Sequence, residues 1–116
     1  MATVTPTVIS RGSMNRTVVT WTGIVTGDTI VTHIVDRAPA LISVQATGTF
    51  NGGTVVGLQT SNDGTNFVNV VDSDGVSVSA KAAAFLSNVV TSGVEYKPTV
   101  GSGSADSITV TLAYWG

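Results

Sequence analysis

The sequence has 116 residues, a formal net charge of −2 and no cysteine. A chain of this length is typical of a single domain with one hydrophobic core, and the absence of cysteine excludes disulfide bonds and thiolate metal sites. The five Lys and Arg residues are scattered, which excludes the basic surface that sequence-independent nucleic-acid binding requires.

Charged residues make up only 10% of the sequence, against about 25% in an average soluble domain. Val and Thr together occupy about a third of the positions, and both favour strands because a branched Cβ fits a pleated sheet. The composition therefore predicts an all-β protein. Dispersed charges normally keep strand edges from pairing with other chains, so a surface this poor in charge indicates that a partner covers part of it.

Residues 1–16 alternate only weakly between apolar and polar types. We expect an extended N-terminal arm or an edge strand here, ahead of a single domain over residues 17–116. Such an arm could add a strand to the sheet of a neighbouring subunit. The segment lacks the basic and apolar stretches of a signal peptide, so we expect synthesis in the cytoplasm and no membrane partner. The interface candidates in the arm are Thr3, Val4, Thr5, Val8 and Ile9.

Alternation of apolar and polar residues predicts strands over 17–24, 29–35 and 41–50. Asn51-Gly52 follows the third of these, and this dipeptide favours a tight hairpin because both residues tolerate positive φ. Further turn residues separate short strands as far as Ser79. The whole stretch 41–79 is therefore predicted to be an antiparallel meander.

The remaining segments complete the predicted fold. Residues 80–87 are rich in Ala, Lys and Leu, which favour a short helix. Residues 89–100 return as a strand, in which Pro98 favours an edge position, and residues 107–115 alternate most clearly of all. We expect an antiparallel β-sandwich (jelly-roll or immunoglobulin-like) or a flattened barrel of about seven to nine strands.

Catalytic residues are scarce in this sequence. His33 is the sole histidine and lies in a predicted strand, where no motif supplies it with a nucleophile and an orienting group. Glu95 is the sole glutamate, and nothing places a second carboxylate across a cleft from it. We therefore interpret both as ordinary strand residues and expect no enzymatic activity and no cofactor.

Three aspartates are weak candidates for a metal site. Asp72 and Asp74, followed by Gly75, resemble the start of a calcium loop, and Asp63 lies one hairpin away. Calcium needs six or more oxygen ligands, which this set does not supply. Asp and Gly are also the residues that tight turns require, so turns are the preferred interpretation.

The aromatic residues allow two interpretations. Trp21 alternates in phase with Val19, which predicts burial, whereas Trp115 is out of phase with Tyr114 and is the better candidate for a contact residue. An exposed Trp on a β-sandwich is also suited to stacking on sugars. A glycan therefore stays open as a ligand.

Several segments together resemble small structural proteins of tailed bacteriophages. The strongest likeness is a strand and turn reading VQATGTFNGG, followed by GLQTSNDGTNF, and four further segments match in the same order. Two mild departures are Phe67, where the family usually has Trp, and Lys97, where it usually has Arg. The matching segments are 44–67, 72–75, 80–86, 96–98 and 101–112.

This resemblance implies a non-enzymatic virion protein, and we expect a capsid decoration (cement) protein that stabilises the head shell. The expected partners are the major capsid protein and copies of the chain itself, as a dimer or trimer, on the head surface. One alternative is a tail or neck component, and another is a carbohydrate-binding β-sandwich module. The motif forms turns and strands, so it implies no functional residues.

Overall fold

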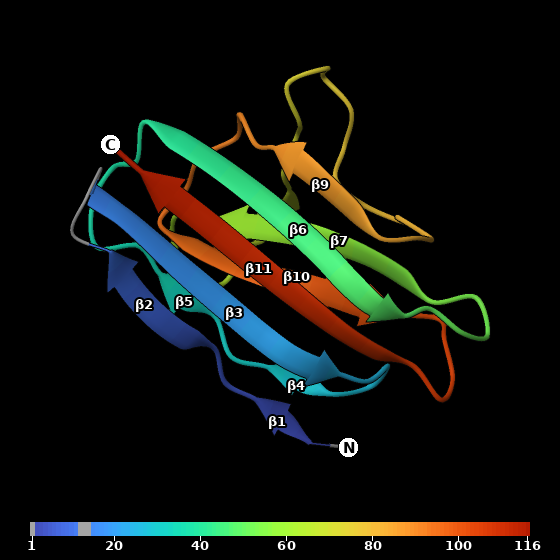
Figure 1. Ribbon diagram of the computed structural model, residues 1–116. Coiled ribbons are helices and arrows are strands. Elements are labelled where there is room, and N and C mark those ends of the chain that lie inside the picture. The colour runs from blue at the N-terminus through green and yellow to red at the C-terminus, as the bar shows by residue number, and fades with distance from the viewer. Residues whose placement is uncertain (1, 12–14) are drawn as a thin grey trace.

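The computed structural model describes residues 2–11 and 15–116, and its regular elements are strands arranged in sheets (Figure 1). The larger sheet has five antiparallel strands in the order β2-β3-β11-β6-β9. The second has four antiparallel strands in the order β5-β10-β7-β8, and a short parallel pair joins β1 to β4. The predicted all-β class is thus confirmed.

The three longest strands have nearly the bounds that the alternation of apolar and polar residues predicts. The final strand has the bounds that the sequence predicts. The five-stranded sheet comprises β2 (Thr7–Arg11), β3 (Arg16–Ile24), β11 (Ser107–Trp115), β6 (Leu41–Thr49) and β9 (Phe85–Asn88). The other strands are β5 (His33–Ile34), β10 (Glu95–Gly101), β7 (Val55–Ser61), β8 (Val68–Asn69), β1 (Thr3–Val4) and β4 (Thr29–Ile30).

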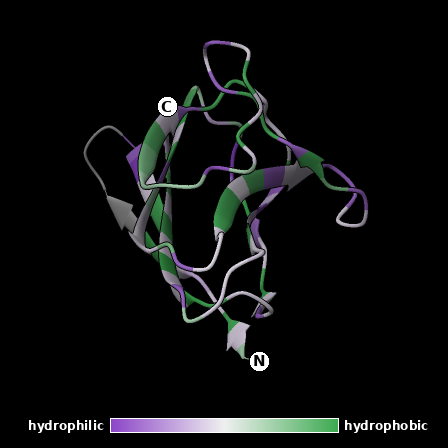
Figure 2. Cartoon of the chain, turned by 90° about the vertical axis from the view of Figure 1, so that its right-hand side faces the viewer, coloured by the Kyte–Doolittle hydropathy of each residue, from purple (hydrophilic) through white to green (hydrophobic). Residues whose placement is uncertain are grey.

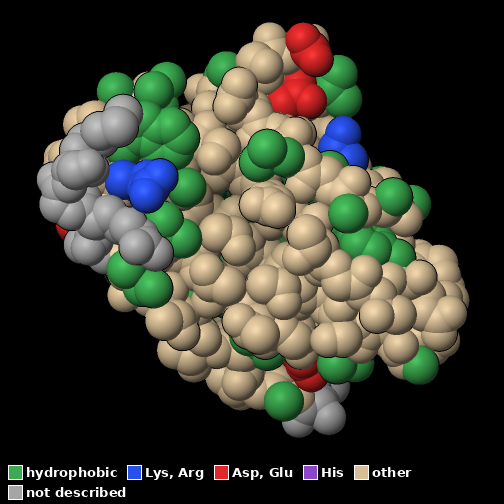
Figure 3. All heavy atoms as spheres, viewed as in Figure 1, with side chains coloured by type: hydrophobic (Ala, Val, Ile, Leu, Met, Phe, Trp, Pro, Cys, Tyr) green, Lys and Arg blue, Asp and Glu red, His purple; other side chains and the backbone are tan. Residues whose placement is uncertain are grey.

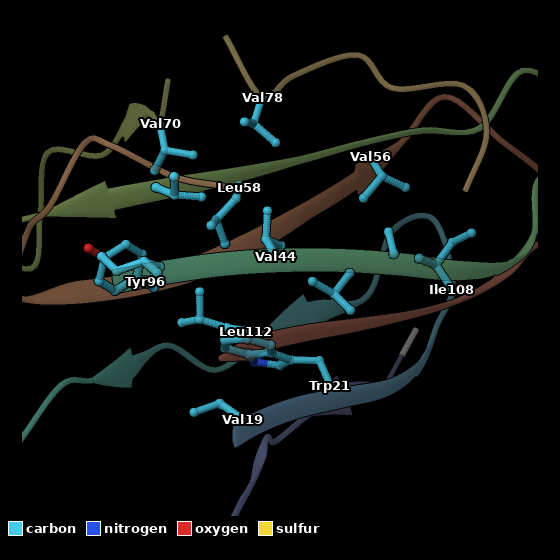
Figure 4. Packing of buried hydrophobic residues seen from close by; sticks show 14 of the residues in the cluster. Val19, Trp21, Val44, Val56, Leu58, Val70, Val78, Tyr96, Ile108 and Leu112 are labelled. Carbon is cyan, nitrogen blue, oxygen red and sulfur yellow. The ribbon is translucent and has the colours of Figure 1, made fainter. Parts of the chain in front are cut away.

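The hydrophobic core lies between the two larger sheets, which form two layers (Figures 1 and 2). Every second residue of β11 from Ile108 to Tyr114 is buried, as the alternation predicts. Trp21 is fully buried, also as predicted, and its indole N–H donates a 2.8 Å hydrogen bond to the carbonyl of Val31. Figure 4 shows how Trp21 and Leu112 of one sheet approach Leu58 of the other.

The predicted hairpin at Asn51-Gly52 is wrong, and with it the first of the three reversals of the predicted meander. β6 pairs with β11 and β9, whereas β7 pairs with β10 and β8, so residues 50–54 carry the chain from one sheet to the other. The physical reason is burial of apolar surface. β6 and β7 each have one apolar face, and placing them in different sheets lets both faces pack into the same core. The other two predicted reversals are confirmed: β7 and β8 pair across the turn 61–66, and Val71 bridges Ser77 antiparallel across the turn 72–75.

The predicted helix over 80–87 is also wrong, because the segment pairs as β structure instead. Lys81 exchanges two 2.9 Å backbone hydrogen bonds with Val56, and β9 then pairs with β6. Ala80 has a φ of +53°, outside the helical region. Two turns of helix are marginal without packing, so pairing with the sheets prevails over helix propensity.

Pro98 was expected on an edge strand, but β10 lies inside its sheet, between β5 and β7. The pairing with β5 extends only over Glu95 and Tyr96, whereas that with β7 continues to Gly101. Pro98 therefore lies beyond the end of β5, where no strand of the described residues is hydrogen-bonded to that side of β10. The missing N–H is tolerated there, as it is at an edge.

Candidate functional site

The three candidate metal ligands lie in two separate turns. Asp72 accepts hydrogen bonds from the backbone N–H groups of Asp74 (2.9 Å) and Val76 (3.0 Å). Asp63 accepts from the N–H groups of Thr65 and Asn66, and these bonds hold its pKa below the ordinary value. In the part of the chain that the structure describes, no three His, Cys, Asp or Glu residues lie close enough to hold a metal ion. The carboxylates here form turns.

His33 belongs to a polar cluster at one end of the molecule. Its Nε2 lies 3.0 Å from the hydroxyl of Tyr114, and that hydroxyl lies 3.2 Å from the carboxylate of Asp36. Arg37 forms a 2.8 Å ion pair with Asp36, and its guanidinium lies 4.9 Å from the ring centroid of Tyr114. The cluster joins β5, the loop after it and the end of β11.

Burial and the charge of Asp36 shift the pKa values of two groups in this cluster. Burial lowers the pKa of His33, and the negative charge of Asp36 raises it again in part. Burial and the same carboxylate raise the pKa of the Tyr114 hydroxyl. Through these hydrogen bonds the group holds the loop after β5 against β11, and His33 contacts no serine in the hydrogen bonds of the described residues. The sequence did not indicate this cluster, since Tyr114 lies 81 positions from His33.

The only glutamate likewise serves the local structure. Glu95 accepts a 2.9 Å hydrogen bond from the hydroxyl of Thr32. The structure places it on β10, opposite Ile34 and Ser61.

No helix among the described residues is long and apolar enough to cross a membrane.

Trp115 lines a surface cleft that has a volume of about 620 Å³. The cleft lies beside the C-terminal end of β11, and Trp115 is half-buried in its wall. Both polar and apolar residues line it, among them Leu41, Ser73, Asn88, Val90 and Ser92. The mixture of an aromatic ring with hydroxyl and amide groups is able to contact a polar ligand that has an apolar face.

The outer face of the five-stranded sheet is uncharged over almost its whole extent. Of the twelve charged residues only Arg11 and Arg16 belong to these five strands, and they pair with each other at one end of β2 and β3. The register aligns two rows of outward residues across the sheet. They are Thr7, Thr20, Thr111, Gln45 and Leu86, and next to them Ile9, Val18, Ala113, Ser43 and Asn88.

The space-filling view shows this face directly: small polar and hydrophobic groups cover its middle, and charged side chains lie at the rim (Figure 3). The opposite face, on the four-stranded sheet, differs. Lys97 of β10 lies 4.4 Å from the ring centroid of Phe67 there, and Glu95 precedes it by two positions on the same strand. We call the first surface, made by the outward residues of β2, β3, β11, β6 and β9, the uncharged face.

The N-terminal interface candidates lie on short strands against the domain. Thr3 and Val4 form β1 and pair with Thr29 and Ile30, while Thr5 follows as an exposed residue. Val8 and Ile9 belong to β2, the end strand of the five-stranded sheet, and are 47% and 45% exposed. Residues 1 and 12–14 of the expected arm lie outside the described residues.

The sequence matches no protein-family model, and neither a curated protein nor a solved structure matches the chain.

Proposed function

We propose that the chain is a non-enzymatic virion structural protein of the decoration type, which binds the phage head shell through its uncharged face. The uncharged face is the observation that carries the proposal. Three strands of nine residues, flanked by β2 with five and β9 with four, give a face of about 600 Å² at about 3.4 Å per residue and about 4.8 Å between strands. A standard protein interface buries about 800 Å² on each partner, so the face has nearly the required size.

The lack of charge on this face favours a protein partner. Interface centres are depleted of charged residues because burying an unpaired charge is costly. The hydroxyl groups of Thr20 and Thr111 are able to form hydrogen bonds while leaving no net charge to desolvate. The major capsid protein is the proposed partner, and the head surface the proposed location.

We further propose that the two layers form a β-sandwich of the jelly-roll type. We number the eight main strands 1 to 8 in chain order, starting at β3 and leaving out the short β4. Their order is then 1-8-3-6 in the larger sheet and 2-7-4-5 in the other. This is the order of a double Greek key, and domains of viral capsids and of lectins use it. The fold therefore supports both a virion role and a sugar-binding role.

The test of the proposed function is binding to heads that lack this protein. Gln45 lies in the middle of the uncharged face, and Gln45→Lys places a charge there; Gln59→Lys places the same charge on the four-stranded sheet, opposite Lys97. We expect wild type and the Gln59 variant to co-sediment with heads, and the Gln45 variant to bind at least tenfold more weakly. Equal binding by both variants would overturn the proposal.

A carbohydrate-binding role is the second candidate, and the cleft at Trp115 is the observation that favours it. An indole ring with Asn88 and Ser92 nearby combines stacking with hydrogen bonding. Binding to a glycan array, lost in Trp115→Ala but kept in Gln45→Lys, would support this function. Absence of binding to any glycan in the wild type would remove it.

A further inference from the structure

The two larger sheets have four edge strands, and these differ greatly in length. β5 and β8 have two residues each and β9 has four, whereas β2 has five. Very short edge strands are one way in which proteins prevent edge-to-edge association. β2 is the longest of the four edges.

β2 also has few of the other protective features of an edge. Its single charged residue is Arg11 at its end, it contains no proline, and its pairing with β3 runs without a bulge. Val8 lies opposite Val19 and Ile9 opposite Val18, so their side chains point to opposite sides of the sheet, and both are nearly half exposed. No strand among the described residues pairs with the other side of β2. The strand therefore offers unpaired backbone groups between two exposed apolar side chains.

We propose that β2 pairs antiparallel with β2 of a second copy of this chain, forming one continuous ten-stranded sheet. The two copies are related by a twofold axis perpendicular to the sheet. In an antiparallel ladder such an axis passes midway between a residue and its own copy on the facing strand. The middle residue of β2 is Ile9, and centring the axis there pairs all five residues, with Val8 opposite Ser10 and Thr7 opposite Arg11 of the second copy.

This register brings no two like charges opposite each other, because each Arg11 faces a threonine. The contact is small, since five residues from each chain meet, and it falls well below the roughly 1,200–2,000 Å² of standard interfaces. We therefore expect a dimer that dissociates in the micromolar range or more weakly. On a particle, many neighbouring copies would strengthen such a contact through high effective concentration. The dimer also joins two uncharged faces into one continuous surface.

The biological role of this dimer rests on the proposed function, but dimerisation itself is measured in solution without phage heads. The first experiment compares Val8→Lys with Val68→Lys by sedimentation equilibrium. Val68 is 59% exposed on β8, so it matches Val8 in type and lies on another edge. We expect a monomer–dimer equilibrium that Val8→Lys weakens at least tenfold and Val68→Lys changes less than twofold. A wild type that stays monomeric at about 1 mM, or equal effects of the two variants, would overturn the proposal.

A second experiment tests the register and does not depend on the stability of a lysine variant. The natural chain has no cysteine, so Ile9→Cys introduces a single thiol. Two residues facing each other in an antiparallel pair have Cα atoms about 4.5–5.5 Å apart, within the range of a disulfide. We expect oxidation to link Ile9→Cys into dimers and to leave Ile34→Cys, on the edge strand β5, monomeric. No linkage, or equal linkage of both variants, would contradict the proposed register.

Failure of this inference and failure of the proposed function are distinguishable. A monomeric protein that still binds heads would remove the β2 dimer alone. A β2 dimer whose binding to heads is unaffected by Gln45→Lys would remove the docking role of the uncharged face alone.

Discussion

The hydroxyl of Thr54 donates a 2.8 Å hydrogen bond to the carboxylate of Asp106, which lies 52 positions away in the sequence. Thr26 donates to the same carboxylate twice, from its backbone N–H at 3.0 Å and from its hydroxyl at 2.6 Å. Asp106 is only 4% exposed. One buried side chain thus ties together the loops that follow β3, β6 and β10 at one end of the molecule.

Replacing Asp106 with Ala should destabilise the fold, because the N–H of Thr26 and the hydroxyl of Thr54 would lose their acceptor inside the protein. We expect a decrease in Tm of about 5 °C or more. The control is Asp74→Ala in the exposed turn 72–75, which should change Tm little. Differential scanning calorimetry checks both, and equal shifts in the two variants would show that Asp106 is not a structural centre.

The same carboxylate predicts a loss of stability in acid. The hydrogen bonds from Thr26 are the main cause that lowers the pKa of Asp106 below its ordinary value of 3.8. The folded state therefore binds a proton less readily than the unfolded chain, and this stabilisation is present above pH 3.8 and lost as the pH falls through the folded pKa. Asp106→Asn should remove this contribution. Urea unfolding at pH 6 and pH 3 should give a smaller difference in the variant than in wild type.

Period-two alternation predicted the long strands well because each of them has one face in the core. Trp21 is buried where its phase with Val19 predicted, and β11 has its predicted bounds. The pairing of strands was not predictable in the same way. Asn51-Gly52 suits a hairpin and a crossover between sheets equally well, since both need only positive φ, and Gly52 indeed has a φ of +68°. Which neighbour a strand takes depends on contacts far away in the sequence.

The candidate sites likewise divide into features formed by residues close in the sequence, which were predictable, and features formed by distant residues, which were not. The turns at Asp63 and Asp72 were predicted because an Asx turn is made by neighbours in the sequence. The cluster of His33 and Tyr114 was not, because its members come from different strands. The low content of charged residues in the sequence indicated a surface of low charge. The strand register was needed to identify the residues that form the uncharged face.

Leu112→Ala should reduce the free energy of unfolding by about 2–5 kcal/mol, as removal of a fully buried leucine side chain leaves a cavity. Leu86 is the matched control, since it is 70% exposed on β9. Leu86→Ala should change the free energy by less than about 0.5 kcal/mol. Urea denaturation measures both values. A cost at Leu86 as large as that at Leu112 would mean that β9 is covered by a partner under the conditions of the measurement.

Gly48→Ala should destabilise the sheet, because Gly48 has a φ of +127° and an added Cβ would overlap the backbone carbonyl oxygen of Ser107. We expect a cost of about 1–3 kcal/mol or more. Gly101→Ala is the control, since φ there is not positive and a Cβ would meet no atom within 4 Å. Thermal unfolding of both variants tests this, and it fails if Gly101→Ala is the more harmful of the two.

The polar cluster around His33 predicts a second pH dependence, nearer neutrality. Burial lowers the pKa of His33 from its ordinary value of 6.5, and the opposing effect of Asp36 is smaller. The folded state therefore disfavours the protonated ring. The contribution of neutral His33 to the free energy of unfolding is fully present above pH 6.5 and decreases as the pH falls below that value. His33→Gln keeps a side chain that can bond to the hydroxyl of Tyr114 but does not titrate. Unfolding by urea at pH 7.5 and pH 5.5 should show a loss of stability in wild type that is reduced in this variant; the same loss in both would mean that other groups cause it.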